Sequence, residues 1–137
     1  MLRVKTSVKR SPIHGLGLFA EERIPQGTIV WAFDRPIDQR FWPVDVVGMS
    51  AIEKAFLARY AFCERGTLVL CGDHARFMNH SDSANCGNNA SRTATIALRD
   101  IAPGEELTDD YTSMEDPWNE FQGVIEAEHM PTGPTLH

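Results

Sequence analysis

Apolar and polar residues alternate over short stretches in the first half of the chain, and turn-forming residues separate these stretches. The pattern predicts strands over residues 2–9, 18–20 and 28–33. Turns rich in Pro and Gly are predicted at residues 11–17 and 25–27. Short β-branched and aromatic runs punctuated in this way are typical of a mainly β domain.

One helix is predicted within this β pattern. Ser50-Ala-Ile-Glu53 has the Ser-x-x-Glu form of a capping box, in which the two side chains satisfy each other's backbone N–H groups. Ile52, Phe56 and Tyr60 follow at a spacing of four residues, which places them on one helix face. We expect the helix to end near Phe62.

The second half of the chain predicts two further strands, over residues 67–71 and 92–99. The segment 73–89 is dense in Asn, Asp, Ser and Gly, whose side chains compete for backbone hydrogen bonds, so it is expected to be irregular. A turn at 101–104 and a short final element over 105–111 complete the pattern.

Length and composition limit the class of protein. The 137 residues, 42% apolar and 23% charged, fit one folded domain rather than a disordered chain. We expect a single domain over residues 1–120 and a short acidic tail over 121–137 that is partly flexible. No stretch approaches the roughly 20 apolar residues that span a bilayer. No membrane association and a cytoplasmic location are therefore expected, although a nuclear or host-delivered location stays open.

The distribution of charge indicates the class of partner, and the cysteine spacing indicates the state of the thiols. The net charge is −6, every Lys and Arg lies at or before Arg99, and ten acidic residues follow it. Such an acidic segment disfavours nucleic-acid binding and favours a Lys/Arg-rich protein or peptide. The three cysteines contain no Cys-x-x-Cys spacing, so buried free thiols are expected.

Three segments carry candidate chemistry: Gly15-Leu-Gly17, Arg76-Phe-Met-Asn-His-Ser-Asp-Ser-Ala-Asn-Cys86 and Gly104-Glu-Glu-Leu-Thr-Asp-Asp-Tyr111. Each has an ordinary explanation when taken alone: a hairpin turn, a loop whose side chains bond their own backbone, and a half-buried strand tyrosine. His80 and Cys86 are potential metal ligands, but no other His or Cys has ligand spacing, so no metal is predicted.

Taken together and in this order, the three segments resemble the SET domain family of protein-lysine methyltransferases. The likeness runs from about Val8 to Trp118 and is closest to the compact, stand-alone SET proteins of viruses and bacteria. It implies a β-clip fold, in which short strands form small sheets with one or two short helices. It also implies a pseudoknot that brings the second and third segments together.

The resemblance implies binding of S-adenosyl-L-methionine. An aromatic residue near the end of the chain would pack on the adenine. The implied cofactor-binding residues are Leu16, Gly17, Asn79, His80, Tyr111 and Trp118.

The resemblance also implies a narrow channel for the target lysine, lined by Tyr111 and Tyr60 as the catalytic residues. A neutral tyrosine with a pKa near 10 is a poor base at neutral pH, so Tyr111 is expected to orient the amine by hydrogen bonding. The implied function is S-adenosylmethionine-dependent lysine N-methylation of a basic, histone-like protein. A homodimer is a further possibility.

Departures from the family pattern leave questions open. Ala84 replaces the usual Pro, and Asp109 stands where Phe or Tyr is common. No cysteine follows Cys86 to share a zinc ion, so Trp118 and Phe121, or a second subunit, must close the channel. Two alternatives remain: a catalytically silent SET fold that binds cofactor or peptide, and an unrelated β-rich interaction protein with accidental motif matches.

Overall fold

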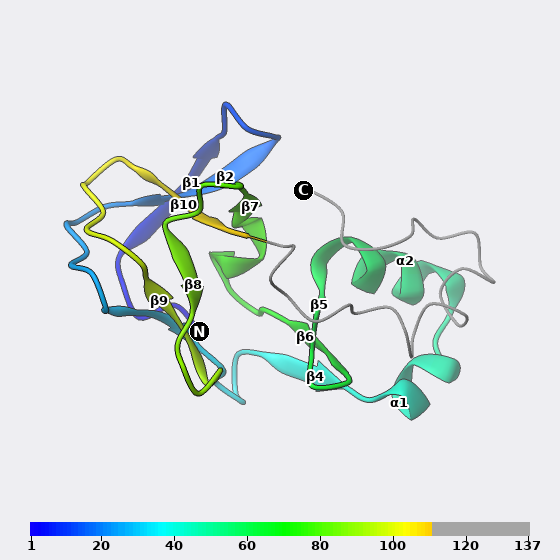
Figure 1. Ribbon diagram of the computed structural model, residues 1–137. Coiled ribbons are helices and arrows are strands. Elements are labelled where there is room, and N and C mark those ends of the chain that lie inside the picture. Colours follow the sequence, from blue (N-terminus) through cyan, green and yellow to red (C-terminus); the bar gives the residue numbers. More distant parts are fainter. Residues whose placement is uncertain (111–137) are drawn as a thin grey trace.

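The computed structural model describes residues 1–110 and shows a mainly β molecule with two short α-helices (Figure 1). A large sheet forms one part of the molecule, and a small sheet with the helices forms the other (Figure 1). In the described residues no helix is long and apolar enough to cross a membrane.

The large sheet contains strands from both ends of the described chain. Its strand order is β1 (Thr6–Arg10), β2 (Leu16–Ala20), β10 (Glu106–Asp109), β8 (Cys86–Asn88), β9 (Ala94–Ala97) and β3 (Ile29–Ala32), and the two-residue strand β7 (Asn79–His80) also pairs with β10. The core beneath it contains Leu18, Val30, Ile101 and Leu107, all with completely buried side chains.

The small sheet has the order β4 (Gln39–Phe41), β6 (Thr67–Leu70) and β5 (Phe62–Glu64). Helices α1 (Pro43–Val47) and α2 (Ala51–Tyr60) lie between β4 and β5 in the chain. They share a second apolar core with β6, to which Leu57, Ala58 and Leu68 contribute. A 3₁₀ helix, His74–Phe77, follows β6 and leads to β7.

Helix α2 has the predicted start but buries a different face. Ser50 Oγ accepts from the Glu53 N–H at 3.2 Å and Glu53 Oε1 accepts from the Ser50 N–H at 2.9 Å, which confirms the capping box. Ile52, however, is 83% exposed, and the helix buries Leu57 and Ala58 instead. Phe56 and Tyr60 do lie on one face, as their spacing predicts, but the helix is most deeply buried along the neighbouring stripe that contains Leu57 and Ala58.

The predicted strands at 18–20, 28–33, 67–71 and 92–99 all appear, with ends shifted by at most two residues. The first strand starts later than predicted, at Thr6, because Leu2 makes only an isolated bridge to Trp31.

The segment 73–89 is more ordered than predicted. It contains the 3₁₀ helix, β7 and β8. Several of its Asn and Asp residues lie in strands or cap a helix rather than forming loops. Asp73, for example, caps the 3₁₀ helix by accepting a hydrogen bond from the Ala75 N–H.

Strand β10, which belongs to the third motif segment, pairs with β7 and β8 of the second segment, so these two segments lie side by side, as expected. It runs parallel to β7, with Thr108 opposite Asn79, and parallel to β8, with Asp109 opposite Cys86. It also pairs antiparallel with β2, where Leu107 faces Leu18. The loop at the chain's end that would complete a pseudoknot lies outside the described residues, as does the expected domain boundary at residue 120.

All three cysteines are buried free thiols, as predicted.

Candidate functional site

Asn79 is the point at which the three motif segments meet. It lies on β7 and its side chain is completely buried. Its amide nitrogen donates to the backbone oxygens of His14 at 3.0 Å and Leu16 at 3.1 Å, and to Glu106 Oε2 at 3.0 Å. The amide orientation is fixed, because a flipped amide would place its oxygen against three acceptors.

The other end of the same amide has no partner. Asn79 Oδ1 is buried and accepts no hydrogen bond from any described residue. A buried acceptor without a donor costs about 1–3 kcal/mol, so such atoms are rare unless a ligand supplies the donor. The predicted cofactor residue Asn79 therefore offers an acceptor to a group that carries N–H donors, such as the amino group of an amino acid.

Leu16 contacts Asn79 through its backbone, and its predicted role in cofactor binding stays a prediction. Its side chain is 42% exposed while its carbonyl oxygen bonds to Asn79. Leu16 and Asn79 are 63 residues apart in the sequence, so the fold brings two of the predicted binding residues together.

Gly17 leaves no room for a larger side chain. A Cβ atom at this position would lie 2.4 Å from Glu106 Oε2 and 2.9 Å from the Ser11 Cβ. The backbone at Gly17 thus lies close to a protein carboxylate, and the predicted role of Gly17 in cofactor binding stays a prediction.

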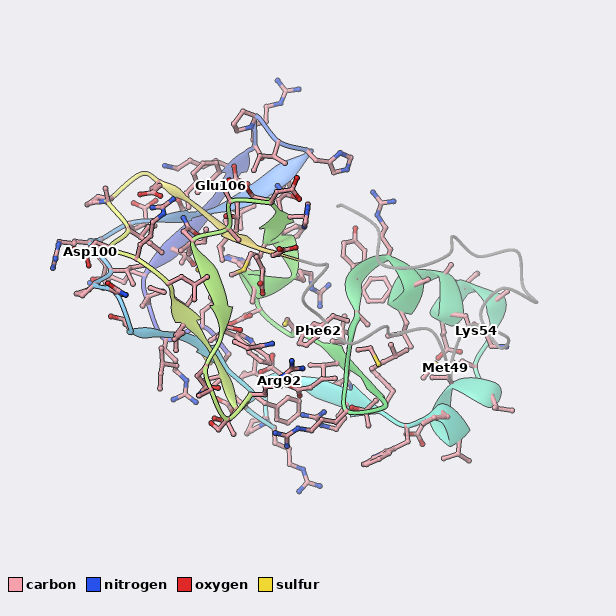
Figure 2. All side chains as sticks on the ribbon, viewed as in Figure 1. Met49, Lys54, Phe62, Arg92, Asp100 and Glu106 are labelled. Carbon is pink, nitrogen blue, oxygen red and sulfur yellow. The ribbon has the colours of Figure 1, made fainter. Side chains whose placement is uncertain are left out.

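Glu106 was missed by sequence reasoning. Its carboxylate accepts from Ser11 Oγ at 2.8 and 2.9 Å and from Asn79, and it occupies the space beneath Gly17. Figure 2 shows Glu106 beside the β1–β2 end of the molecule. The sequence did contain a signal for this role: Glu106 lies in the predicted final element with core residues, and an acidic side chain that is buried there needs hydrogen-bond partners.

His80 is half-buried next to Asn79. Its Nε2 lies 2.9 Å from Asp82 Oδ1, and its Nδ1 lies 3.8 Å from Asp110 Oδ1. These three residues bring one potential ligand atom each to within 4.8 Å of one another. Contacts between the histidine and the two carboxylates account for this grouping without a metal ion.

Asp109 lies at a hollow lined by β8, the turn between β8 and β9, and the end of β10. The hollow has a volume of about 380 Å³, and its lining includes Cys86, Leu98, Arg92 and Asp110. Figure 2 shows Arg92 toward the β8–β9 turn. Burial, and then repulsion from Asp110, raise the pKa of Asp109 to about 6, although the Asp110 N–H bonded to its Oδ1 at 2.8 Å opposes the shift.

Tyr60, the predicted channel residue, is the last residue of α2 and belongs to an aromatic cluster. Its ring centroid lies 5.0 Å from that of Phe56, and the Arg76 guanidinium lies over both rings at 5.5 and 5.7 Å. Arg76 also donates two hydrogen bonds to the Cys71 backbone oxygen, at 3.1 and 2.9 Å. The first residue of the second motif segment therefore contacts the predicted channel residue.

The two remaining predicted residues, Tyr111 and Trp118, lie outside the described residues.

A family model, the SET domain, matches residues 15–112, which is most of the chain. The chain belongs to the SET domain family. The matched range includes all three motif segments, so the alternative of an unrelated β-rich protein with accidental motif matches is wrong.

Two relatives illustrate the similarity within the family. The chain is 32% identical over 113 residues to the Aspergillus fumigatus histone-lysine N-methyltransferase, H3 lysine-4 specific, covering 74% of this SET domain chain and 9% of that protein. It is 32% identical over 116 residues to human histone-lysine N-methyltransferase 2B, covering 76% and 4%, respectively. The chain thus spans less than a tenth of the length of either relative.

A solved structure supports the fold. The Neurospora SET domain protein DIM-5, a histone lysine methyltransferase, superimposes with a TM-score of 0.54 at 19% identity, covering 80% of this chain and 53% of that one. A mainly β SET fold with small sheets and short helices is therefore shown.

Proposed function

We propose that this SET domain is an S-adenosylmethionine-dependent protein-lysine N-methyltransferase that acts on a basic, Lys-rich protein. The observation that carries the proposal is the unpartnered, fully buried Oδ1 of Asn79 at the meeting point of the three motif segments. SET domains generally use S-adenosyl-L-methionine, and its amino acid part carries the N–H donors that this acceptor lacks.

The residues present fit this cofactor. The backbone of Leu16 and Gly17, with Asn79 and His80, would hold it from the described part of the chain. Tyr111 and Trp118 would complete the site. When bound, the cofactor supplies an activated methyl group for transfer to an amine.

The role of the protein's own residues is to align the lysine amine with the methyl group of the cofactor. In-line transfer between two bound groups gains most from fixed positions, and the buried, hydrogen-bonded Asn79 is such a fixed point. Tyr111 and Tyr60 would line the lysine channel, and Tyr111 would orient the amine by hydrogen bonding rather than act as a base.

Two features support a basic substrate. Both relatives are histone-lysine N-methyltransferases, and histones are basic proteins. The chain itself carries a net charge of −6, which favours association with a Lys/Arg-rich partner. We also propose that this SET domain is of the compact type, which its three motif segments resemble.

One observation favours a second candidate, a silent SET fold that binds cofactor or peptide without transfer. Asp109 places an ionisable group where the family commonly has an aromatic residue, at a hollow beside β10. A charged side chain in that position would hold a cation without promoting loss of its proton.

Two measurements separate the candidates. Calorimetric titration with S-adenosylhomocysteine tests binding, and methyl transfer from labelled cofactor to a mixture of basic proteins tests activity. The enzyme proposal expects both signals, with transfer reduced about 100-fold in Tyr111→Phe because the amine loses its alignment. Binding without transfer supports the silent candidate. No binding of S-adenosylhomocysteine at millimolar concentration overturns the enzyme proposal and the cofactor-binding form of the silent candidate.

A further inference from the structure

Two adjacent glutamates at the start of β10 have different partners. The Glu105 carboxylate accepts from Arg99 at 2.6 Å, from Asn85 Nδ2 at 3.2 Å and from the Ala102 N–H at 3.1 Å. The Glu106 carboxylate instead accepts hydrogen bonds from Asn79 and Ser11. Each glutamate therefore braces one buried asparagine of the second motif segment.

The side-chain amides of Asn85 and Asn79 differ in whether both their nitrogen and their oxygen have hydrogen-bond partners. Asn85 donates to the Glu106 backbone oxygen and to Glu105, and its Oδ1 accepts from the Thr108 N–H at 2.9 Å. Both ends of this amide are satisfied, which is the pattern of a structural residue. Asn79 has only its nitrogen satisfied within the described chain.

Glu106 is also hydrogen-bonded, through Ser11, to the turn between β1 and β2. The Ser11 hydroxyl, which donates to Glu106, accepts from the Ile13 N–H at 2.9 Å and the His14 N–H at 3.4 Å. The same turn supplies the His14 and Leu16 carbonyls that hold Asn79. One carboxylate thus links the turn and the asparagine into a closed ring of hydrogen bonds.

We propose that Glu106 is a positioning residue for cofactor binding, acting through Asn79 and the β1–β2 turn. The inference rests on the proposed function. Glu106 holds the Asn79 amide with its oxygen free and keeps the Leu16 backbone in place, so the site is formed before the cofactor arrives. Preformed sites bind more tightly because ordering costs are already met.

The Glu106→Ala variant tests this role. It removes the acceptor shared by Asn79 and Ser11 and leaves space beneath Gly17. We expect its affinity for S-adenosylhomocysteine to fall at least about tenfold. The KM for a basic peptide should stay within about twofold, because the network contains neither of the proposed channel residues.

The matched control is Glu105→Ala. It removes a neighbouring carboxylate with a similar number of hydrogen bonds, but those bonds brace Asn85 rather than Asn79. Its affinity for S-adenosylhomocysteine should stay within about twofold of the wild type even where its melting temperature falls.

The conservative variant Glu106→Gln separates geometry from general destabilisation. A glutamine can accept from Asn79 with its oxygen and donate to Ser11 Oγ with its nitrogen. We expect most of the affinity to be retained, within about threefold of the wild type.

Gly17 gives a coupling test. Gly17→Ala should lower the affinity strongly in the wild type, because the new Cβ would meet Glu106 Oε2 at 2.4 Å. In the Glu106→Ala background the same substitution should cost less, since only the contact with Ser11 remains tight.

Calorimetry on the full chain, together with hydrogen exchange of the Asn79 side-chain amide by NMR, distinguishes the outcomes. Slow exchange in the wild type and faster exchange in Glu106→Ala, with the expected affinity loss, supports the inference. Wild-type affinity in a folded Glu106→Ala variant, or an equal loss in Glu105→Ala, overturns the inference alone. Failure of the wild type to bind S-adenosylhomocysteine overturns the proposed function and the positioning role with it.

Discussion

The side-chain oxygen of Asn85 accepts a hydrogen bond from the backbone N–H of Thr108 at 2.9 Å, which fastens β10 to the segment that enters β8. Asn85 is 1% exposed, and its nitrogen donates to the Glu106 backbone oxygen at 2.8 Å. Asn85→Ala should therefore lower the free energy of unfolding by about 2 kcal/mol, because buried backbone groups lose their partner. Urea denaturation at neutral pH measures the change.

Asn88→Ala is the control for that experiment. Asn88 is exposed and lies three residues further along the same part of the chain, so its loss should change stability by less than about 0.5 kcal/mol. Equal urea midpoints for Asn85→Ala and the wild type would show that Asn85 does not hold β10 in place.

Arg76 supports the next prediction. It anchors to the Cys71 carbonyl and lies over the rings of Phe56 and Tyr60. Arg76→Ala should lower the free energy of unfolding by about 1–3 kcal/mol, because the variant loses two hydrogen bonds and two cation–π contacts. If Tyr60 lines the lysine channel, the KM for a basic peptide should also rise.

Arg76→Lys should recover only part of this loss of stability, because an ammonium cannot reproduce the planar pair of N–H donors. The surface control is Arg23→Ala, whose ion pair with Asp100 is more than half exposed on both sides and should contribute little. Full stability in Arg76→Lys would contradict the proposed role of the guanidinium.

Local signals in the sequence were enough for much of the fold. The Ser50–Glu53 capping box and the Pro- and Gly-rich turns act over a few residues, so the helix start and most strands were predictable. Helix α1 had a local signal that was overlooked: Pro43 at its first position and Asp45, which accepts from the Trp42 N–H at 2.8 Å.

The site was predictable only in part, because its contacts are remote in sequence. Leu16, Asn79 and His80 followed from the family resemblance of their segments. The role of Glu106 depends on Ser11, 95 residues away, and on Asn79, 27 residues away. No periodicity over a single element encodes such a pairing, and the reason for Gly17 became visible only with Glu106 beneath it.

The cysteines lead to a prediction about reactivity. Burial, and then the charge of Asp109, raise the pKa of the Cys86 thiol to about 12, and burial also raises the pKa of Cys71. Since the thiolate is the reactive form, a thiol reagent at neutral pH should modify less than about one cysteine per native chain over minutes. In denaturant it should modify all three. Rapid labelling of the native protein would contradict this burial.

Asp109 gives a pH-dependent prediction with a definite sign. Its pKa in the folded protein is about 6, raised mainly by burial and further by Asp110, while His80 on β7 and the Asp110 N–H lower it. An unfolded aspartate titrates near about 3.9. Between these values the folded state holds the proton more tightly, so this contribution to stability is full below about pH 4 and is lost as the pH rises through about 6.

Asp109→Asn cannot ionise, so it should match the wild type near pH 4 and be more stable near pH 7, by about 1–3 kcal/mol. Urea denaturation at several pH values between these limits follows the divergence. Asp100→Asn should show the opposite trend, because the Gln26 N–H and then Arg23 lower the pKa of Asp100, and that stabilisation is lost as the pH falls. A difference between Asp109→Asn and the wild type that does not change with pH would mean that Asp109 titrates normally, and the carboxylate at the hollow would then be fully solvated.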